Sequence, residues 1–267
     1  MIHNVLSIAG SDPSGGAGIQ ADLKTFAANG TYGMAVLTAL TAQNTRGVSG
    51  VETVSPAFVQ AQIAAVFDDI RVDAVKIGMI ATADIAIAVA EVLSRHPGVP
   101  IVLDPVMVAK GGATLLAEDA IAAVRSALLP LAAVVTPNLA EAARLLDQPQ
   151  ATDRSGMARQ AAALVELGPR AALVKGGHLD GSDSPDVLHS MGDVHWLEAI
   201  RTPGRNTHGT GCTLSSALAA HLARGASPHD AAISAKRYVT GAIAAADTLS
   251  VGHGHGPVHH FHALWRD

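Results

Sequence analysis

Residues 74–103 read AVKIGMIATADIAIAVAEVLSRHPGVPIVL, and this stretch decides the fold class. Two short apolar runs, 74–77 and 101–103, flank an alanine-rich stretch, 83–95, that carries polar residues on one side. The apolar runs are continuous rather than alternating, which is typical of strands covered on both faces. The stretch between them is typical of an amphipathic helix. A strand–helix–strand unit of this kind predicts a parallel sheet with helices on both faces.

The same alternation extends along the rest of the chain. It predicts further strands at 5–9, 34–40, 133–135 and 171–174, and further helices at 19–29, 57–69, 117–128, 157–167, 211–224 and 228–247. Residues 184–197 break the rhythm and predict an antiparallel hairpin at one sheet edge, turning around Met191, Gly192 and Asp193. No internal repeat or linker composition divides the chain, so we expect a single α/β domain over residues 1–267, with 251–267 as a Gly/His-rich tail.

The composition limits the classes of function. Of the 267 residues, 49% are hydrophobic and 15% are charged, which is typical of a folded protein. The formal net charge of -5 argues against a nucleic-acid partner. The single cysteine excludes an internal disulfide framework and fits a reducing compartment. No run approaches the ~18 apolar residues of a membrane span, and no basic leader precedes the first apolar run, so we expect a soluble, cytoplasmic protein.

Ligands of such sheets bind beyond the carboxyl ends of the strands. The residues that follow the predicted strands include Gly10, Gln43, Met79, Asp104, Asn138 and Lys175. Their polar groups and glycines predict a ligand site at this edge of the sheet.

The strongest single motif is THGTGCT, residues 207–213, directly before a predicted helix. Gly209 and Gly211 allow a close approach of the backbone, and free amides at a helix start bind anions. Thr210 lies between them. The motif therefore predicts a phosphate site, and the alternative is an ordinary loop in which a threonine caps the helix.

Cys212 lies at the same predicted helix start. The helix dipole and the free amides there lower a thiol pKa, which favours a thiolate near neutral pH. A buried, inert thiol is the alternative, since that is the common state of a lone cysteine. The residues around it leave both possibilities open.

Three charged residues suggest a metal and phosphate site. Asp104 ends a buried strand, where a carboxylate needs solvent or a cation. Asn138 and Glu141 have the spacing of a helix capping box, and they could also hold Mg²⁺ directly or through water. Lys175 precedes two glycines and suits a phosphate, although a solvated lysine on a turn explains it equally well.

Other motifs are less informative. Residues 16–21, GAGIQA, match a dinucleotide fingerprint, but no strand precedes them directly and no acid ends the second strand, so an oxidoreductase is not expected. The chain also lacks a P-loop motif. Residues 251–262 hold five of the 13 histidines in no standard zinc spacing, so we expect a solvated tail rather than a metal site.

Seven segments together resemble one known family. They are SIAGSDPSGGAGIQADLKTF (7–26), TALTAQNT (38–45), KIGMI (76–80), DPVMVAKGG (104–112), TPNLAEA (136–142), VKGGH (174–178) and THGTGCTLSSALAA (207–220). In this order they resemble the hydroxymethylpyrimidine/phosphomethylpyrimidine kinases of thiamine biosynthesis over nearly the whole chain. The resemblance implies a ribokinase-like three-layer α/β/α fold and the use of ATP and Mg²⁺. It implies phosphorylation of 4-amino-5-hydroxymethyl-2-methylpyrimidine and then of its monophosphate to the diphosphate.

The resemblance also implies roles at the substrate end of the site. Gln43 is expected to hydrogen-bond the pyrimidine edge, because its amide offers both a donor and an acceptor. Asp22 is expected to face the substrate, Met79 to pack on the ring, and Gly10 to line the same pocket.

At the phosphate end, the resemblance implies an anion hole at residues 209–212 and makes Cys212 the base. Lys175, Thr210 and Gly211 are expected to bind the phosphates of ATP. The expected Mg²⁺ ligands are Asp104, Glu141 and Asn138.

Three alternatives accompany this hypothesis. Pyridoxal/pyridoxine kinases share the fold and the cysteine, so vitamin B6 salvage is the nearest alternative activity. A binding protein that has lost catalysis is disfavoured because the chemical groups are retained together. A cysteine hydrolase lacks a histidine partner, for which His208 is only a weak candidate. A homodimer is expected by analogy with the fold.

Overall fold

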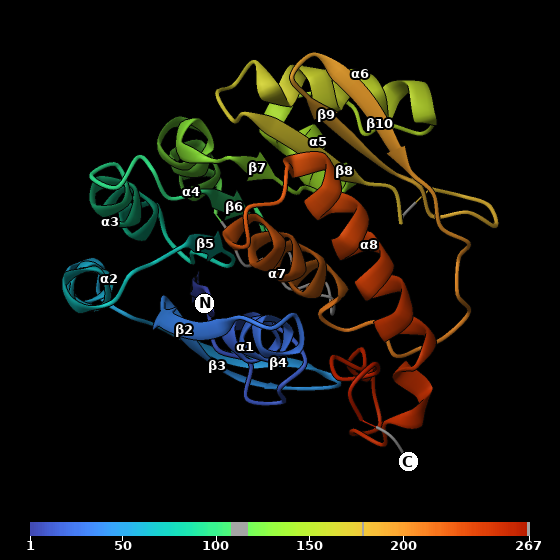
Figure 1. Cartoon of the computed structure of the whole chain (residues 1–267), viewed down its shortest axis with the longest axis horizontal. Helices are drawn as coiled ribbons and strands as arrows, with labels where there is room; N and C mark the ends of the chain where they lie inside the picture. Colours follow the sequence, from blue (N-terminus) through green and yellow to red (C-terminus); the bar gives the residue numbers. More distant parts are fainter. Residues whose placement is uncertain (108–116, 178, 266–267) are drawn as a thin grey trace.

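The computed structural model describes residues 1–107, 117–177 and 179–265. Residues 108–112 of the DPVMVAKGG segment, His178 and residues 266–267 lie outside this description. The main sheet has eight strands in the order β10-β9-β8-β7-β6-β5-β1-β2 (Figure 1). The strands are β1 Asn4–Ala9, β2 Tyr32–Leu37, β5 Ala74–Ile77, β6 Ile101–Leu103, β7 Val134–Val135, β8 Ala171–Lys175, β9 Asp186–Ser190 and β10 Asp193–Leu197. Neighbours from β2 to β8 pair in parallel, and β9 and β10 form the predicted antiparallel hairpin at one edge.

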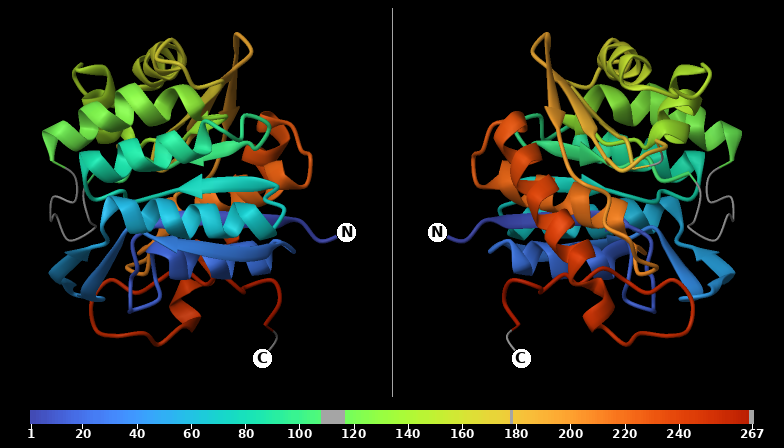
Figure 2. Two further views of the ribbon diagram at one scale, coloured as in Figure 1. Left: turned by 90° about the vertical axis from the view of Figure 1, so that its left-hand side faces the viewer. Right: turned by 90° about the vertical axis from the view of Figure 1, so that its right-hand side faces the viewer.

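Helices cover both faces of this sheet, which confirms the predicted three-layer α/β/α architecture (Figures 1 and 2). On one face lie α1 Gly18–Ala28, α7 Thr210–Ala223 and α8 Pro228–Ala244. On the other lie α2 Pro56–Asp69, α3 Ala83–Leu93, α4 Glu118–Ala123, α5 Leu139–Leu146 and α6 Arg154–Val165. The predicted helix 117–128 begins as α4 and continues as a π-helical turn, Val124–Leu128.

The continuous apolar runs follow from this burial on both faces. In β1, Val5 packs into the core beneath α1, α7 and α8, whereas Leu6 packs into the core beneath the other helices. Val134 and Val135 of β7 divide between the two cores in the same way. Successive side chains of a strand point to opposite faces, so a strand covered on both faces is apolar at most positions. Buried Ser7 in β1 and buried Lys76 in β5 depart from this pattern.

The predicted strand 34–40 is wrong at its end. β2 stops at Leu37, and the chain leaves the main sheet to form β3 Ala39–Asn44 and β4 Gly47–Thr53, an antiparallel pair that we call the arm. The sequence did not predict the arm, because β3 (ALTAQN) lacks the continuous apolar run by which the other strands were identified. A register shift lies between Ala42 and Gln43, and such bulges redirect the side chains beside them.

The predicted solvated tail is wrong for residues 256–260. These residues are buried, with Val258 fully buried and His259 and His260 8% and 4% exposed, whereas residues 251–253 and 263–265 are exposed. Within residues 1–107, 117–177 and 179–265, no group of three or more His, Cys, Asp or Glu residues could hold a metal ion. No helix in these ranges is long and apolar enough to cross a membrane.

Candidate functional site

The first turn of α7 has no side-chain cap. Gly209 occupies the cap position with a left-handed backbone (φ 77°) and no side-chain hydrogen bond, whereas Ser55, Thr82 and Ser227 cap α2, α3 and α8. The first amides of a helix lack partners within the helix. The alternative in which a threonine side chain caps this helix is therefore wrong. The N–H groups of Thr210 and Thr213 donate to the carbonyls of Thr207 (3.4 Å) and Gly209 (2.8 Å), and the amides of Gly211 and Cys212 lie between them at the helix start, where anions bind.

Glycines bring the entry loop, residues 10–18, against the start of α7. A Cβ atom on Gly209 would lie 1.8 Å from the carbonyl oxygen of Gly16. A Cβ atom on Gly10 would lie 2.3 Å from the terminal methyl of Met79, so Met79 packs directly on that glycine. The predicted substrate residues Gly10 and Met79 are therefore neighbours, and the entry loop connects them to the predicted anion hole.

Lys175 lies among the carboxylates that sequence analysis grouped with it. Its Nζ is 2.8 Å from Oδ1 of Asp104 and 4.0 Å from Oε2 of Glu141, and its side chain is 15% exposed. A Cβ atom on Gly211 would lie 3.3 Å from the same Nζ. The lysine is therefore not a solvated turn residue, and its charge lies beside the first turn of α7. Ser215 of α7 donates to Oδ2 of Asp104 (3.2 Å).

The pKa values of the two carboxylates in this cluster, Asp104 and Glu141, are shifted in opposite directions. Burial raises the pKa of Glu141 to about 7, and Asp104 adds to the increase although Lys175 opposes it. Burial also favours a higher pKa for Asp104, but Lys175 and Lys76 together hold it below its usual value. Asp104 is therefore the ionised partner of Lys175, whereas burial favours the protonated form of Glu141.

The predicted capping box is confirmed. Oδ1 of Asn138 accepts the N–H of Glu141 (2.9 Å), and Oε2 of Glu141 accepts the N–H of Asn138 (2.7 Å). The capping box is compatible with the predicted metal role of Asn138, because a side-chain oxygen that accepts one hydrogen bond retains a second lone pair. Oε2 of Glu141 and both carboxylate oxygens of Asp104 also accept hydrogen bonds, so the predicted roles of Asp104, Asn138 and Glu141 at Mg²⁺ stay predictions.

Cys212 lies in the first turn of α7 and interacts with the backbone amide of Gly18. Burial raises the pKa of its thiol to about 11, and Lys76 opposes this increase whereas Asp22 and Asp104 add to it. Of the two alternatives that the sequence left open, burial therefore favours the buried, neutral thiol over the thiolate. Removal of the thiol from water and two nearby carboxylates outweigh the helix start and the lysine.

Asp22 does not face an open pocket, which corrects a second prediction. It forms an ion pair with Lys76 (2.8 Å), and both side chains are 0% exposed. Ser7 and Ser216 also donate to the Asp22 carboxylate, at 2.6 and 2.7 Å. Four hydrogen bonds thus satisfy this carboxylate inside the protein, between β1, β5, α1 and α7.

Gln43 contacts a histidine that sequence analysis treated only as a weak candidate. The Nε2 atoms of Gln43 and His208 are 3.3 Å apart, and Nε2 of His208 is 2.8 Å from Oδ2 of Asp12. His208 therefore links the arm to the entry loop, immediately before Gly209. The signal for this contact was weak in the sequence because the three residues are far apart along the chain.

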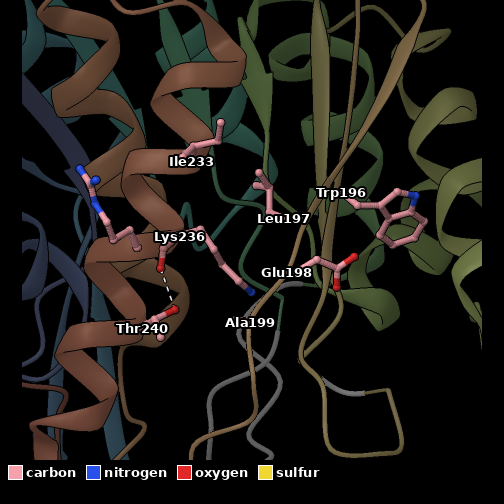
Figure 3. Close-up of a pocket in the computed structure, with 8 residues that line it drawn as sticks. Trp196, Leu197, Glu198, Ala199, Ile233, Lys236 and Thr240 are labelled. Carbon is pink, nitrogen blue, oxygen red and sulfur yellow. Dashed lines mark hydrogen bonds between the residues drawn. The ribbon is translucent and has the colours of Figure 1, made fainter.

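A cavity of about 390 Å³ lies between the end of β10 and α8, as Figure 3 shows. Its walls include Leu197 and Glu198 on one side and Ile233, Lys236 and Thr240 on the other. Nζ of Lys236 is 2.8 Å from Oδ2 of Asp186, whose Oδ1 accepts the N–H of Gly176 (2.9 Å). This hydrogen-bonded connection links the cavity wall to the residue after Lys175.

A family model described as phosphomethylpyrimidine kinase matches residues 12–259. The chain belongs to this family. It is 55% identical to the hydroxymethylpyrimidine/phosphomethylpyrimidine kinase of Escherichia coli over 98% of both chains. It is 51% identical to a thiamine biosynthesis bifunctional protein of Geobacter sulfurreducens, over 96% of this chain and 52% of that protein. A structure of Bacillus subtilis pyridoxal kinase with ADP is 37% identical, covers both chains fully and has a TM-score of 0.92.

The close contact between Gly209 and the Gly16 carbonyl can be tested by substitution. We expect Gly209→Ala to abolish measurable phosphorylation and to lower the melting temperature, because the new Cβ collides with the Gly16 carbonyl. Gly192→Ala is the matched control. Gly192 also has a left-handed backbone (φ 87°) but open space around it, so its variant incurs only the backbone cost of about 1–2 kcal/mol. Equal melting temperatures for the two variants would contradict the close contact.

The buried pair makes a separate prediction about Asp22. Lys76→Met leaves the Asp22 carboxylate buried without its counter-ion and should cost about 3–5 kcal/mol of unfolding free energy in urea. The double variant Lys76→Met/Asp22→Asn should recover part of that loss because the uncompensated charge is gone. If Asp22→Asn alone instead raised the KM for substrate at unchanged stability, Asp22 would be a substrate contact after all.

Proposed function

We propose that this protein transfers the γ-phosphoryl group of ATP to 4-amino-5-hydroxymethyl-2-methylpyrimidine and then phosphorylates the monophosphate to the diphosphate, for thiamine biosynthesis. The observation that carries this proposal is the family match over residues 12–259. It is supported by the position of Lys175 and Asp104 beside the uncapped start of α7. Activity toward pyridoxal is the second candidate, since a pyridoxal kinase shares the fold at 37% identity.

Phosphoryl transfer depends mainly on positioning and on stabilising charge. The amides of Gly211 and Cys212 would donate to the equatorial oxygens of the transferred group, with Thr210 beside them. Lys175, held by Asp104, would place a positive charge next to those oxygens. The Asp104–Lys175 pair would also keep the lysine oriented, because its Nζ already donates to a fixed carboxylate.

Mg²⁺ would be held by Asp104 and Glu141, which fit it as hard oxygen donors. The ion usually keeps several waters and binds one or two carboxylates together with phosphates. Contacts through such waters would leave in place the bonds from Lys175 to Asp104 and from the Asn138 N–H to Glu141. When bound, Mg²⁺ supplies positive charge to the phosphate oxygens.

At the other end of the site, Gly10, Met79 and Gln43 would hold the pyrimidine. Met79 would offer an apolar surface to the ring, and the Gln43 amide would pair with the ring edge. For the base of ATP, we propose the cavity between β10 and α8. Its apolar and polar walls and its volume suit a planar heterocycle, and Asp186 connects it to the residues around Lys175.

The substrate assignment makes a direct prediction. ATP consumption with the hydroxymethylpyrimidine, its monophosphate, pyridoxine, pyridoxal and ribose should give the highest kcat/KM for the pyrimidines, because the Gln43 amide suits an aminopyrimidine edge. Gln43→Leu should raise the pyrimidine KM about 10-fold while the KM for ATP stays constant, since a lost partner costs about 1–3 kcal/mol. A higher kcat/KM for pyridoxal would assign the protein to vitamin B6 salvage instead.

Cys212 can be tested by separating the two phosphorylation steps. In the first step the nucleophile is a neutral alcohol that must lose a proton, and a base contributes typically about 10²–10⁴-fold. In the second step it is a phosphate oxygen that is already anionic. If Cys212 is the base, its thiol, whose pKa burial raises to about 11, must lose its proton once the substrate and ATP are bound, and Cys212→Ser should then slow the first step far more than the second. Equal losses in both steps would mean that Cys212 only shapes the anion hole.

A further inference from the structure

Residues 252–260, near the C-terminus, run across the end of the molecule where the arm and the start of α7 meet. Figures 1 and 2 place this segment, in red, beside the blue arm and entry loop. We call it the strap. It contacts residues within two positions of Gln43, Gly209 and Cys212, and none of these contacts has a part in the function proposed above.

One end of the strap binds the arm. The N–H of Gly254 donates to Oγ1 of Thr45 (3.1 Å), and the N–H of His255 donates to the Thr45 carbonyl (2.9 Å). Thr45 lies in the turn between β3 and β4, two residues beyond Gln43. The strap therefore holds the arm at the end from which Gln43 reaches the site.

The middle of the strap binds the loop before α7. The N–H of His208 donates to the Gly256 carbonyl (3.0 Å), and the N–H of Val258 donates to the His208 carbonyl (3.3 Å). Both backbone groups of His208 are thus bonded to the strap. The N–H of Gly256 also donates to Oδ1 of Asn206 (3.0 Å).

The far end of the strap is fixed to α7 and α8. Val258 is fully buried, and Nε2 of His260 is 3.2 Å from Oγ1 of Thr213 in the first turn of α7. The hydroxyl of Tyr238 donates to the His260 carbonyl (2.6 Å), and the N–H of His259 donates to the Ala242 carbonyl (2.9 Å). The strap is therefore anchored to α7 and α8 at this end and can hold the arm close to the start of α7.

Three strap glycines lie close to their partners. A Cβ atom on Gly254 would lie 2.1 Å from the carbonyl oxygen of Thr45, a backbone atom that cannot move aside. On Gly252 and Gly256 it would lie 2.3 Å from side-chain atoms, Oγ1 of Thr45 and Oδ1 of Asn206. Gly254 does not have a left-handed backbone. Its need for glycine thus comes from the contact with the arm and not from its own conformation.

We infer that the strap positions Gln43 relative to the anion hole. It holds Thr45 on one side and His208 on the other, and His208 itself contacts Gln43 (3.3 Å) and Asp12 (2.8 Å). The strap residues would touch neither substrate nor phosphate, so their role is positioning. This inference deepens the proposed function and rests on it for the identity of the substrate. Ordering a mobile loop when a ligand binds costs entropy and weakens binding. Because the strap already fixes the arm, Gln43 would bind the pyrimidine without this cost.

The test is Gly254→Ala, with Gly98→Ala as its matched control. Gly98 has open space around it and no left-handed backbone, so its variant should behave as the unaltered protein. We expect Gly254→Ala to raise the KM for the hydroxymethylpyrimidine about 10-fold, the effect of about 1.4 kcal/mol. The KM for ATP should stay within about 2-fold, because in the described part of the chain the hydrogen bonds of the strap go to residues that neither line the β10–α8 cavity nor include Lys175. Equal increases in both KM values, or no increase in either, would overturn the inference.

A second measurement does not depend on the substrate. Hydrogen exchange of the amides in the arm, residues 39–53, should be faster in Gly254→Ala than in Gly98→Ala, while exchange in α3 is the same in both. Unchanged exchange in the arm would refute the positioning role of the strap even if the enzyme proved active on the pyrimidine. Faster exchange in a protein that turned over only pyridoxal would support the positioning role and refute the proposed substrate.

Discussion

The ion pair between Lys76 and Asp22 is the interaction on which the site depends. A charge at the centre of an apolar sheet is tolerated only when it is paired and hydrogen-bonded. Here the Asp22 carboxylate accepts from Lys76, Ser7 and Ser216, and so joins β5, β1, α1 and α7 at one point. Because Ser216 lies one turn after Cys212, this point also fixes where the first turn of α7 stands relative to the sheet.

The charges around that point are balanced rather than isolated. Lys76 helps to keep Asp104 ionised, and Asp104 in turn is the partner of Lys175. The same lysine pulls the pKa of the Cys212 thiol down while burial and the two aspartates push it up. A phosphate that entered beside Lys175 would add negative charge to a region that already holds two lysines and three carboxylates, those of Asp22, Asp104 and Glu141. A divalent cation brought with that phosphate would offset the added charge, in keeping with the proposed use of Mg²⁺.

Close backbone contacts do the remaining positioning, and glycine makes them possible. Gly209 meets Gly16, Gly10 meets Met79, and Gly254 meets Thr45 at distances where a Cβ atom would overlap its neighbour. Entry loop, arm, α7 and strap are thus brought to one place by contacts between segments far apart in the sequence. The abundance of glycine in this chain, 26 residues of 267, has one of its physical reasons here.

The sequence by itself determined the main sheet except for the end of β2, and most of the helices. Short continuous apolar runs such as Ile101–Leu103, between alanine-rich helical stretches, indicate strands covered on both faces, and the Asn138–Glu141 spacing indicates a helix start. Tertiary structure decided the rest. The state of Cys212 depends on burial and on Asp22, Asp104 and Lys76, which no local motif contains. Asp22 became the partner of Lys76, and the histidine-rich tail became a strap, because hydrogen bonds between residues 47 to 209 positions apart have no signature in either partner's local sequence.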